Sequence, residues 1–229
     1  MLVARGFLAE SLLCYKKALL LSPPAETLPT ILVNKATVEI ALGDSASALR
    51  DLAVAEKVAG PLDEILTNRG VAYSNDAKWD KAIEQFEKVL LSPITGGRFA
   101  LPWWLRYSQC LLEVGREQEA ETFLQRTIQR WVARISVRSI VSIYRIRHLR
   151  WRAWYRYGDE VECKVFGAAL YFKTGNSEEG RKYWLQVSDA DRMYYSTDVD
   201  SLLQKKLKWG PIGVASYKAF LSSKFSRTS

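Results

Sequence analysis

The sequence predicts an all-α fold in which antiparallel helix pairs repeat along the chain. Small and apolar residues recur at spacings of three and four, which places each set on one face of a helix. A similar unit recurs after 34 residues, since Ala48 and Ala82 take the same place in two neighbouring units. Glycine or proline stands at most of the predicted helix ends. Together these observations are typical of a helical repeat protein.

The clearest helix pair spans residues 62–93. Spacing places three residues on one face of each helix: Leu66, Gly70 and Tyr73 on the first, and Ala82, Phe86 and Val89 on the second. Gly70 and Ala82 are small, so the two helices can approach closely, while the two aromatic residues fill the space beside them. Pro93 ends the second helix because its ring cannot continue the hydrogen-bond ladder.

This pair resembles a tetratricopeptide repeat (TPR). That pattern has a small residue in the first helix and an aromatic residue three positions later. Alanine follows early in the second helix, then an aromatic residue and a proline. An ordinary helical hairpin is the alternative for this segment taken alone. The resemblance implies a right-handed TPR superhelix of antiparallel helix pairs with a C-terminal capping helix.

Two units precede this pair in the predicted array. Residues 6–23 supply only the second helix of a repeat, so this unit is partial. Residues 27–60 form a full pair with its turn at Gly43. Glu39 stands in this pair where the repeat pattern has an aromatic residue.

Two further units follow it. A loop rich in glycine and proline over residues 92–104 leads into the fourth unit, whose turn is at Gly115. The repeat pattern then breaks, and it resumes at Asp159 with the fifth unit and its turn at Gly175.

A last amphipathic helix at about residues 212–221 is expected to cap the end of the array, as solenoids require. We therefore expect a TPR-like helical repeat domain over residues 1–200, with a basic and aromatic insertion at about residues 128–158. Residues 201–229 form the C-terminal capping helix and tail.

Two motifs carry a narrower resemblance: Asn68-Arg69-Gly70-Val71-Ala72-Tyr73 and Lys78-Trp79-Asp80-Lys81-Ala82-Ile83. They are similar to the NRG-x-A-x…W-x-x-A-I pattern of a TPR family of chloroplasts and cyanobacteria. Residues 159–222 resemble that family's closing segment, although the family has proline at Gly210 and tryptophan at Ser201. The resemblance implies a plastid protein attached to, or working beside, a thylakoid membrane complex such as a photosystem.

Composition and the pattern of apolar residues limit the classes of protein to which the chain can belong. The chain has 229 residues, a formal net charge of +8 and three widely spaced cysteines, which argue against a disulfide framework. No apolar run approaches the roughly 18 residues that mark a membrane-spanning helix. The chain starts directly in a helical pattern without a signal or transit peptide. An organelle protein is therefore expected to be in mature or truncated form here.

Patterns typical of catalysis are missing. The single histidine, His148, has no serine, cysteine or carboxylate at motif spacing beside it. The cysteines lack the C-x-x-C spacing of zinc sites, and Gly96-Gly97 is not followed by the Lys-Ser/Thr of a phosphate loop. We therefore expect no enzyme, no metal and no cofactor.

Asn34 and Asn68 are the first candidates for partner binding. They lie 34 residues apart at equivalent places in two first helices, on the face expected to line the concave groove. Asparagine side chains in such a groove can hold a peptide backbone or its terminal carboxylate. The lysines of a carboxylate clamp are replaced by Thr30, Thr67 and Val71, so the clamp is incomplete. A purely structural role is the alternative.

An arginine-rich segment is the second candidate. From Thr122 to Gly158 the chain has nine arginines and no lysine or acidic residue. Four of the arginines recur every four residues and form one slowly winding helical stripe. The partner-binding residues expected in this segment are Arg126, Arg130, Arg134, Arg138, Arg150, Trp131 and Trp151. An anionic lipid surface, an acidic protein or nucleic acid would each suit them, and an extended solvated helix is the alternative.

These observations predict a non-catalytic protein–protein interaction scaffold. By resemblance it is located in the plastid and associated with the thylakoid, where it assists assembly of a membrane complex or is a bound subunit. One alternative is an organellar RNA-binding helical repeat protein, which needs base-reading side chains recurring in each repeat. Only Asn34 and Asn68 recur, so nucleic acid is the less favoured partner. Another alternative is a structural subunit of a ribosome-like assembly.

Overall fold

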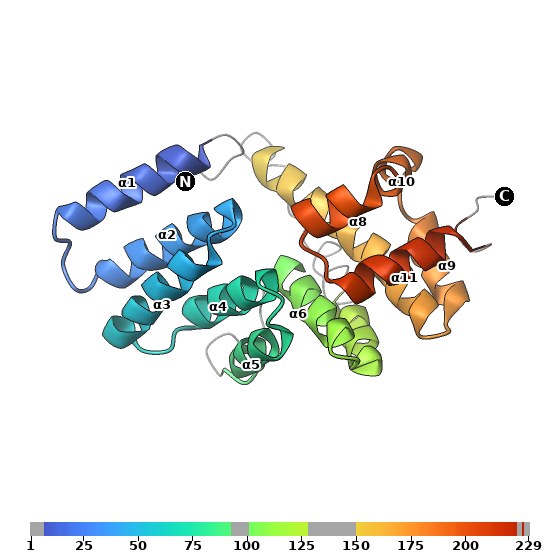
Figure 1. The fold of residues 1–229 in the computed structure, drawn as a ribbon, viewed down its shortest axis with the longest axis horizontal. Helices are drawn as coiled ribbons and strands as arrows, with labels where there is room; N and C mark the ends of the chain where they lie inside the picture. The colour runs from blue at the N-terminus through green and yellow to red at the C-terminus, as the bar shows by residue number, and fades with distance from the viewer. Residues whose placement is uncertain (1–6, 93–100, 128–149, 224–225, 227–229) are drawn as a thin grey trace, which may run out of the picture. The chain divides into compact units, whose positions relative to one another are not determined.

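The computed structural model describes residues 7–92, 101–127, 150–223 and 226. Over these residues the secondary structure is helical and contains no strand, which confirms the all-α prediction. The chain forms two compact units, Met1–Phe99 and Ala100–Ser229 (Figure 1). Within the described segments, none of the helices combines the length and apolar character needed to cross a bilayer.

The helices described in the first unit are α1 (Leu8–Leu20), α2 (Leu28–Leu42), α3 (Ser45–Ala59), α4 (Asp63–Asn75) and α5 (Trp79–Leu90). Each helix packs on the next, and α2 also packs on α4. Apolar residues from several of these helices meet in one core: Leu32, Ala36, Ala48, Leu52, Ala55 and Ile65. Burying one large aliphatic side chain of this kind stabilises the fold by about 1.5–3 kcal/mol.

The turn between α2 and α3 is built from local signals. Gly43 ends α2 in the left-handed region, with φ at +87°, where a side chain would be strained. Asp44 caps α3, since its Oδ1 accepts a hydrogen bond of 3.0 Å from the backbone N–H of Ser47. The turn therefore falls at the predicted residue.

The α4–α5 pair shows the expected close approach. A Cβ added at Gly70 would lie 2.8 Å from ring atoms of Phe86, so only glycine fits without a shift of the ring. Ala82, Phe86 and Val89 are buried on the facing side of α5. Leu66 and Gly70 are buried on α4, whereas Tyr73, the third residue of the predicted stripe, is only half-buried.

The second unit begins with α6 (Leu101–Glu113), followed by a helical segment over residues 117–127. Its later elements are α8 (Arg150–Lys173), α9 (Ser177–Leu185), α10 (Asp189–Ser196), the π-helix η2 (Asp200–Lys206) and α11 (Pro211–Leu221). α8 packs on α9, and α11 packs on α8 and α6.

Close packing also joins α8 to α9. A Cβ added at Gly180 would lie 2.8 Å from the backbone oxygen of Ala168, so the two helices approach almost to backbone contact. Gly175 turns the chain between them with φ at +85°. Helices α8 and α9 therefore make a second tightly packed pair at the position predicted for the fifth unit.

The N-terminus of α11 is fixed by Glu113, at the end of α6. The backbone N–H groups of Gly213 and Ile212 donate hydrogen bonds of 2.7 and 3.0 Å to its carboxylate. A carboxylate there also interacts favourably with the helix dipole. A Cβ added at Gly210 would lie 2.3 Å from Cδ of Glu113, so a larger residue there would require the Glu113 side chain to shift.

Aromatic side chains form the core between α8, α9 and α11. Trp184 meets Phe220 and Tyr217 edge to face, with ring centroids 5.5 and 6.1 Å apart. Phe166 meets Trp209 in the same way at 5.2 Å. Such pairs contribute about 0.5–1.5 kcal/mol beyond the area they bury. The predicted last helix is thus an integral part of the second unit's core.

Candidate functional site

Asn34 and Asn68 lie on two helices that pack against each other, α2 and α4. Asn68 is 9% exposed, and Asn34 is half-buried. Neither amide makes a hydrogen bond with another residue in the described part of the chain. Each amide can both donate and accept, which suits a peptide backbone.

The clamp positions around these asparagines offer no cation. Thr30 is exposed, whereas the hydroxyl of Thr67 donates a 2.6 Å hydrogen bond to the backbone oxygen of Asp63 within α4. Val71 is half-buried and apolar. The geometry therefore favours contact with backbone amides over capture of a terminal carboxylate.

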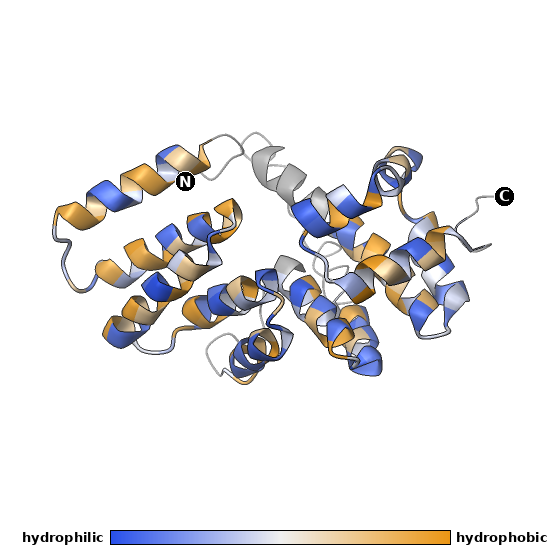
Figure 2. Cartoon of the chain, viewed as in Figure 1, coloured by the Kyte–Doolittle hydropathy of each residue, from blue (hydrophilic) through white to orange (hydrophobic). Residues whose placement is uncertain are grey.

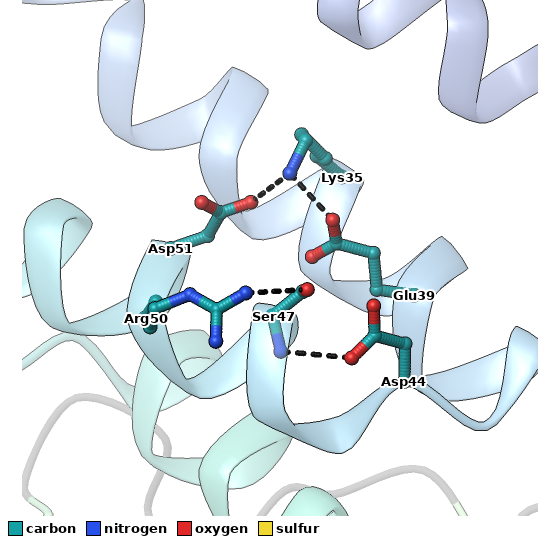
Figure 3. A network of polar contacts seen from close by, with 6 residues as sticks. All are labelled: Lys35, Glu39, Asp44, Ser47, Arg50 and Asp51. Atoms are coloured by element: carbon teal, nitrogen blue, oxygen red, sulfur yellow. Dashed lines mark hydrogen bonds and ion pairs between the residues drawn. The ribbon is translucent and has the colours of Figure 1, made fainter.

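A buried ionic cluster joins α2 to α3 (Figure 3). The Lys35 ammonium donates a hydrogen bond of 2.5 Å to Glu39, one turn further along α2, and another to Asp51 of α3. Lys35 and Glu39 are only 8% and 3% exposed. The ion pairs explain how the Glu39 carboxylate can be buried at this position of α2.

The cluster carries more negative than positive charge, with two carboxylates around one ammonium. Burial would lower the pKa of Lys35, but the hydrogen bonds to Asp51 and Glu39 outweigh it and the pKa is raised. Burial, together with the nearby Asp51 carboxylate, raises the pKa of Glu39, and its Oε2 has no hydrogen-bond partner. The Lys35 ammonium is therefore already occupied by the carboxylates of Glu39 and Asp51.

The arginine-rich segment falls largely outside the described residues. Arg126 is exposed at the end of the helical segment over residues 117–127. The residues predicted to bind a partner that lie outside the described part are Arg130, Trp131, Arg134 and Arg138. Arg150 and Trp151 fall in the first turn of α8, and their side chains also lie outside that part. The cationic stripe therefore stays a prediction.

A second polar cluster, in the other unit, was not found from the sequence. Oε1 of Glu162 on α8 accepts hydrogen bonds from Trp209 Nε1 at 2.8 Å and from Gln109 Nε2 at 3.4 Å. Arg106 donates to the backbone oxygens of Lys208 and Leu207 at 2.7 and 3.0 Å. Burial raises the pKa of Glu162. These contacts fasten the chain before α11 to α6 and α8, which is a structural role.

Reactive groups are not assembled into a catalytic centre in the part that the structure describes. Cys110 is buried, and burial raises the pKa of its thiol to about 12, so it is not a thiolate at neutral pH. Within the described ranges, no three His, Cys, Asp or Glu side chains converge in a way that could hold a metal ion. His148 lies outside these ranges.

Comparison with known proteins identifies no family for this chain. Neither a scan against protein-family models nor a search of curated proteins found a match to the chain. The function must therefore be argued from the residues themselves. The most informative of these are the paired helices and the two asparagines on α2 and α4.

Proposed function

We propose that this chain is a non-catalytic, TPR-type interaction protein that holds a segment of a partner protein along α2 and α4. The observation that carries the proposal is the pair Asn34 and Asn68. They recur after 34 residues, lie on helices in direct contact, and keep amides that no other described residue uses. Neither amide holds a buried polar atom that lacks a partner, so both stay open to water or to a ligand.

The bound segment is best described as an extended peptide recognised through its backbone. An asparagine amide can donate to a peptide carbonyl and accept from a peptide N–H at the same time. Asn34 and Asn68 would then hold two points of the peptide on neighbouring helices. The excess negative charge at Lys35, Glu39 and Asp51 favours a neutral or basic segment over an acidic one.

The array is proposed to be a right-handed TPR superhelix with α11 as its C-terminal cap. Support comes from the tight α4–α5 and α8–α9 pairs, in which glycine allows near-contact of the helices. The resemblance of residues 68–73 and 78–83 to a chloroplast and cyanobacterial TPR family supports a plastid location. On this proposal the partner belongs to a thylakoid membrane complex, such as a photosystem, that the protein helps to assemble or joins as a subunit.

The arginine-rich segment is proposed as a second point of attachment. Its arginines and tryptophans would contact an acidic surface of the partner complex or anionic lipid beside it. An exposed arginine near an anionic bilayer contributes about 1 kcal/mol. RNA is the alternative ligand for this segment, and a structural place in a ribosome-like assembly is the other alternative.

The double variant Asn34→Ala, Asn68→Ala tests the proposal. Tagged parent and variant proteins are incubated with solubilised thylakoid membranes in mild detergent, and the captured proteins are identified by mass spectrometry. The matched control is Asn176→Ala, because Asn176 is exposed and its side chain makes no capping hydrogen bond. The double variant should lose the partner that the parent and the control retain.

Equal capture by all three proteins would contradict peptide binding at the two asparagines. Capture of RNA with the parent protein, lost after ribonuclease treatment together with every protein partner, would favour the RNA-binding alternative instead.

A further inference from the structure

The segment that contains η2 and α11 is bound by residues that lie far from it in the chain. Arg106 on α6 donates hydrogen bonds to the backbone oxygens of residues 207–208, which lie just before α11. Glu113, at the end of the same helix, accepts hydrogen bonds from the backbone N–H groups of residues 212–213. Two side chains of α6 therefore contact the main chain of this segment at two points, before α11 and in its first turn.

Aromatic side chains attach the same segment to α8 and α9. Nε1 of Trp209 donates a 2.8 Å hydrogen bond to Glu162 on α8, and its ring meets Phe166 edge to face. Phe220 on α11 meets Trp184 on α9 in the same way. Apolar residues recur along α11 (Figure 2). The segment is thus bound as a partner chain is bound in a complex, through main-chain hydrogen bonds and buried aromatic residues.

The connection that leads into this segment is short and strained. Helix α10 ends at Ser196 and η2 begins at Asp200, so only residues 197–199 join them. Asp198, in the middle, has φ at +49°, in the left-handed region that residues with a side chain seldom adopt. A short connection under strain favours domain swapping, because the strain is lost when the connection straightens and the segment packs on another copy.

We propose that two copies of the chain swap the segment that starts at η2, so that α11 of each copy packs on α6 and α8 of the other. The swapped dimer keeps the contacts of the closed monomer, because the two copies have the same residues. Only residues 197–199 change conformation, and both copies lose the strain at Asp198. The swap lies within the second unit and does not involve Asn34 or Asn68, so it stands or falls separately from the proposed function.

Domain swapping competes with closure within a single chain. A segment on a short connection has an effective concentration in roughly the millimolar range at its own binding surface, so the closed monomer predominates in dilute solution. The swapped dimer is expected to accumulate when the unfolded protein refolds at high concentration. Because α11 must leave the aromatic core before the two forms interconvert, monomer and dimer should interconvert slowly and separate on a size-exclusion column.

Substitutions at Asp198 should shift the balance in opposite directions. Asp198→Gly takes a positive φ without strain, so it should lower the dimerisation constant about tenfold. Asp198→Pro fixes φ near about −65° and disfavours the closed turn, so it should raise the constant by a similar factor. Asp198→Asn is the matched control, because asparagine tolerates the left-handed region, and it should behave as the parent does. Each protein is refolded from urea at a series of concentrations, and the dimer fraction is measured by size-exclusion chromatography with light scattering once it is constant.

Amide hydrogen exchange distinguishes a swapped dimer from two closed monomers that associate through their surfaces. In the swapped dimer the N–H groups of residues 212–213 should be as protected as in the monomer, since Glu113 of the other copy accepts the same hydrogen bonds. Only residues 197–199 should then exchange at a different rate. Surface association would instead protect residues elsewhere and leave residues 197–199 unchanged.

Three outcomes would overturn the proposal: a parent protein that is monomeric at every concentration, a dimer fraction that Asp198→Gly and Asp198→Pro do not shift in opposite directions, or a dimer whose protection pattern is that of surface association. Circular dichroism verifies that each variant keeps its helicity. If Asp198→Pro loses helicity, Asp198→Val takes its place, since a β-branched residue is also disfavoured at positive φ and does not restrict the residue before it.

Discussion

Replacing Gly70 with alanine should destabilise the α4–α5 pair, although alanine is the better helix former. Alanine is favoured over glycine inside a helix by about 1 kcal/mol. The new Cβ would lie 2.8 Å from the ring of Phe86, which is only 5% exposed and has little room to move. Overpacking of this kind typically costs about 1–3 kcal/mol. The clash should therefore outweigh the propensity gain and leave a net loss of about 1 kcal/mol.

Urea unfolding followed by circular dichroism measures this loss. Gly213→Ala is the control, because its Cβ would come no nearer than 3.4 Å to another atom and should leave stability unchanged or slightly raised. Truncating the ring by Phe86→Leu should cost less in the Gly70→Ala background than in the parent, since the two sites are in contact. If Gly70→Ala instead stabilises the protein as much as the control does, the close approach of α4 and α5 is wrong.

Other contacts give three further predictions. Gly210→Ala would set a Cβ 2.3 Å from Cδ of Glu113, so it should lower the free energy of unfolding by about 1–3 kcal/mol. Amide hydrogen exchange in α11 should become faster, and unchanged exchange would contradict the packing of α11 on Glu113. Burial raises the pKa of Glu162 above its ordinary value of about 4.5. The folded protein therefore holds this proton more tightly than the unfolded chain does, and the free energy of unfolding of the parent should fall as the pH rises from about 4.5 through the raised folded pKa. Glu162→Gln cannot titrate and should lack this loss; parallel curves for the two proteins in urea unfolding from pH 4 to 8 would refute the assignment. Replacing the four regularly spaced arginines with glutamine should lower the affinity for anionic vesicles by roughly two to three powers of ten. If the affinity depends neither on these substitutions nor on the salt concentration, the arginines do not anchor the protein to an anionic surface. These arginines are Arg126, Arg130, Arg134 and Arg138.

Features that depend on neighbouring residues could be predicted from the sequence. The closeness of Gly70 to Phe86 followed from the spacing of small and aromatic residues on two adjacent helices. The turns at Gly43 and Gly175 followed from the freedom of glycine to take positive φ. In each case the determining residues lie within one helical hairpin, so a local pattern contains the information.

Contacts between distant residues could not be predicted in this way. From the sequence, Glu39 was a departure from the expected repeat pattern. In the structure it is buried in an ion pair with Lys35, which also pairs with Asp51 of the next helix, and the repeat pattern does not reveal this contact. The one available signal was a lysine four residues before the glutamate. Trp209 lies 47 residues from its acceptor, Glu162, and no spacing rule links them.

The attachment of α11 to Glu113 has a consequence for how the protein is made. The hydrogen bond from Gly213 spans 100 residues, so bringing its ends together costs chain entropy before any contact compensates for it. During synthesis Phe166 and Trp184 are made before Trp209, Tyr217 and Phe220, the aromatic residues that they contact in the folded unit. Until those residues are made and α11 packs on α8, the nascent second unit exposes aromatic side chains that a chaperone or a protease could meet.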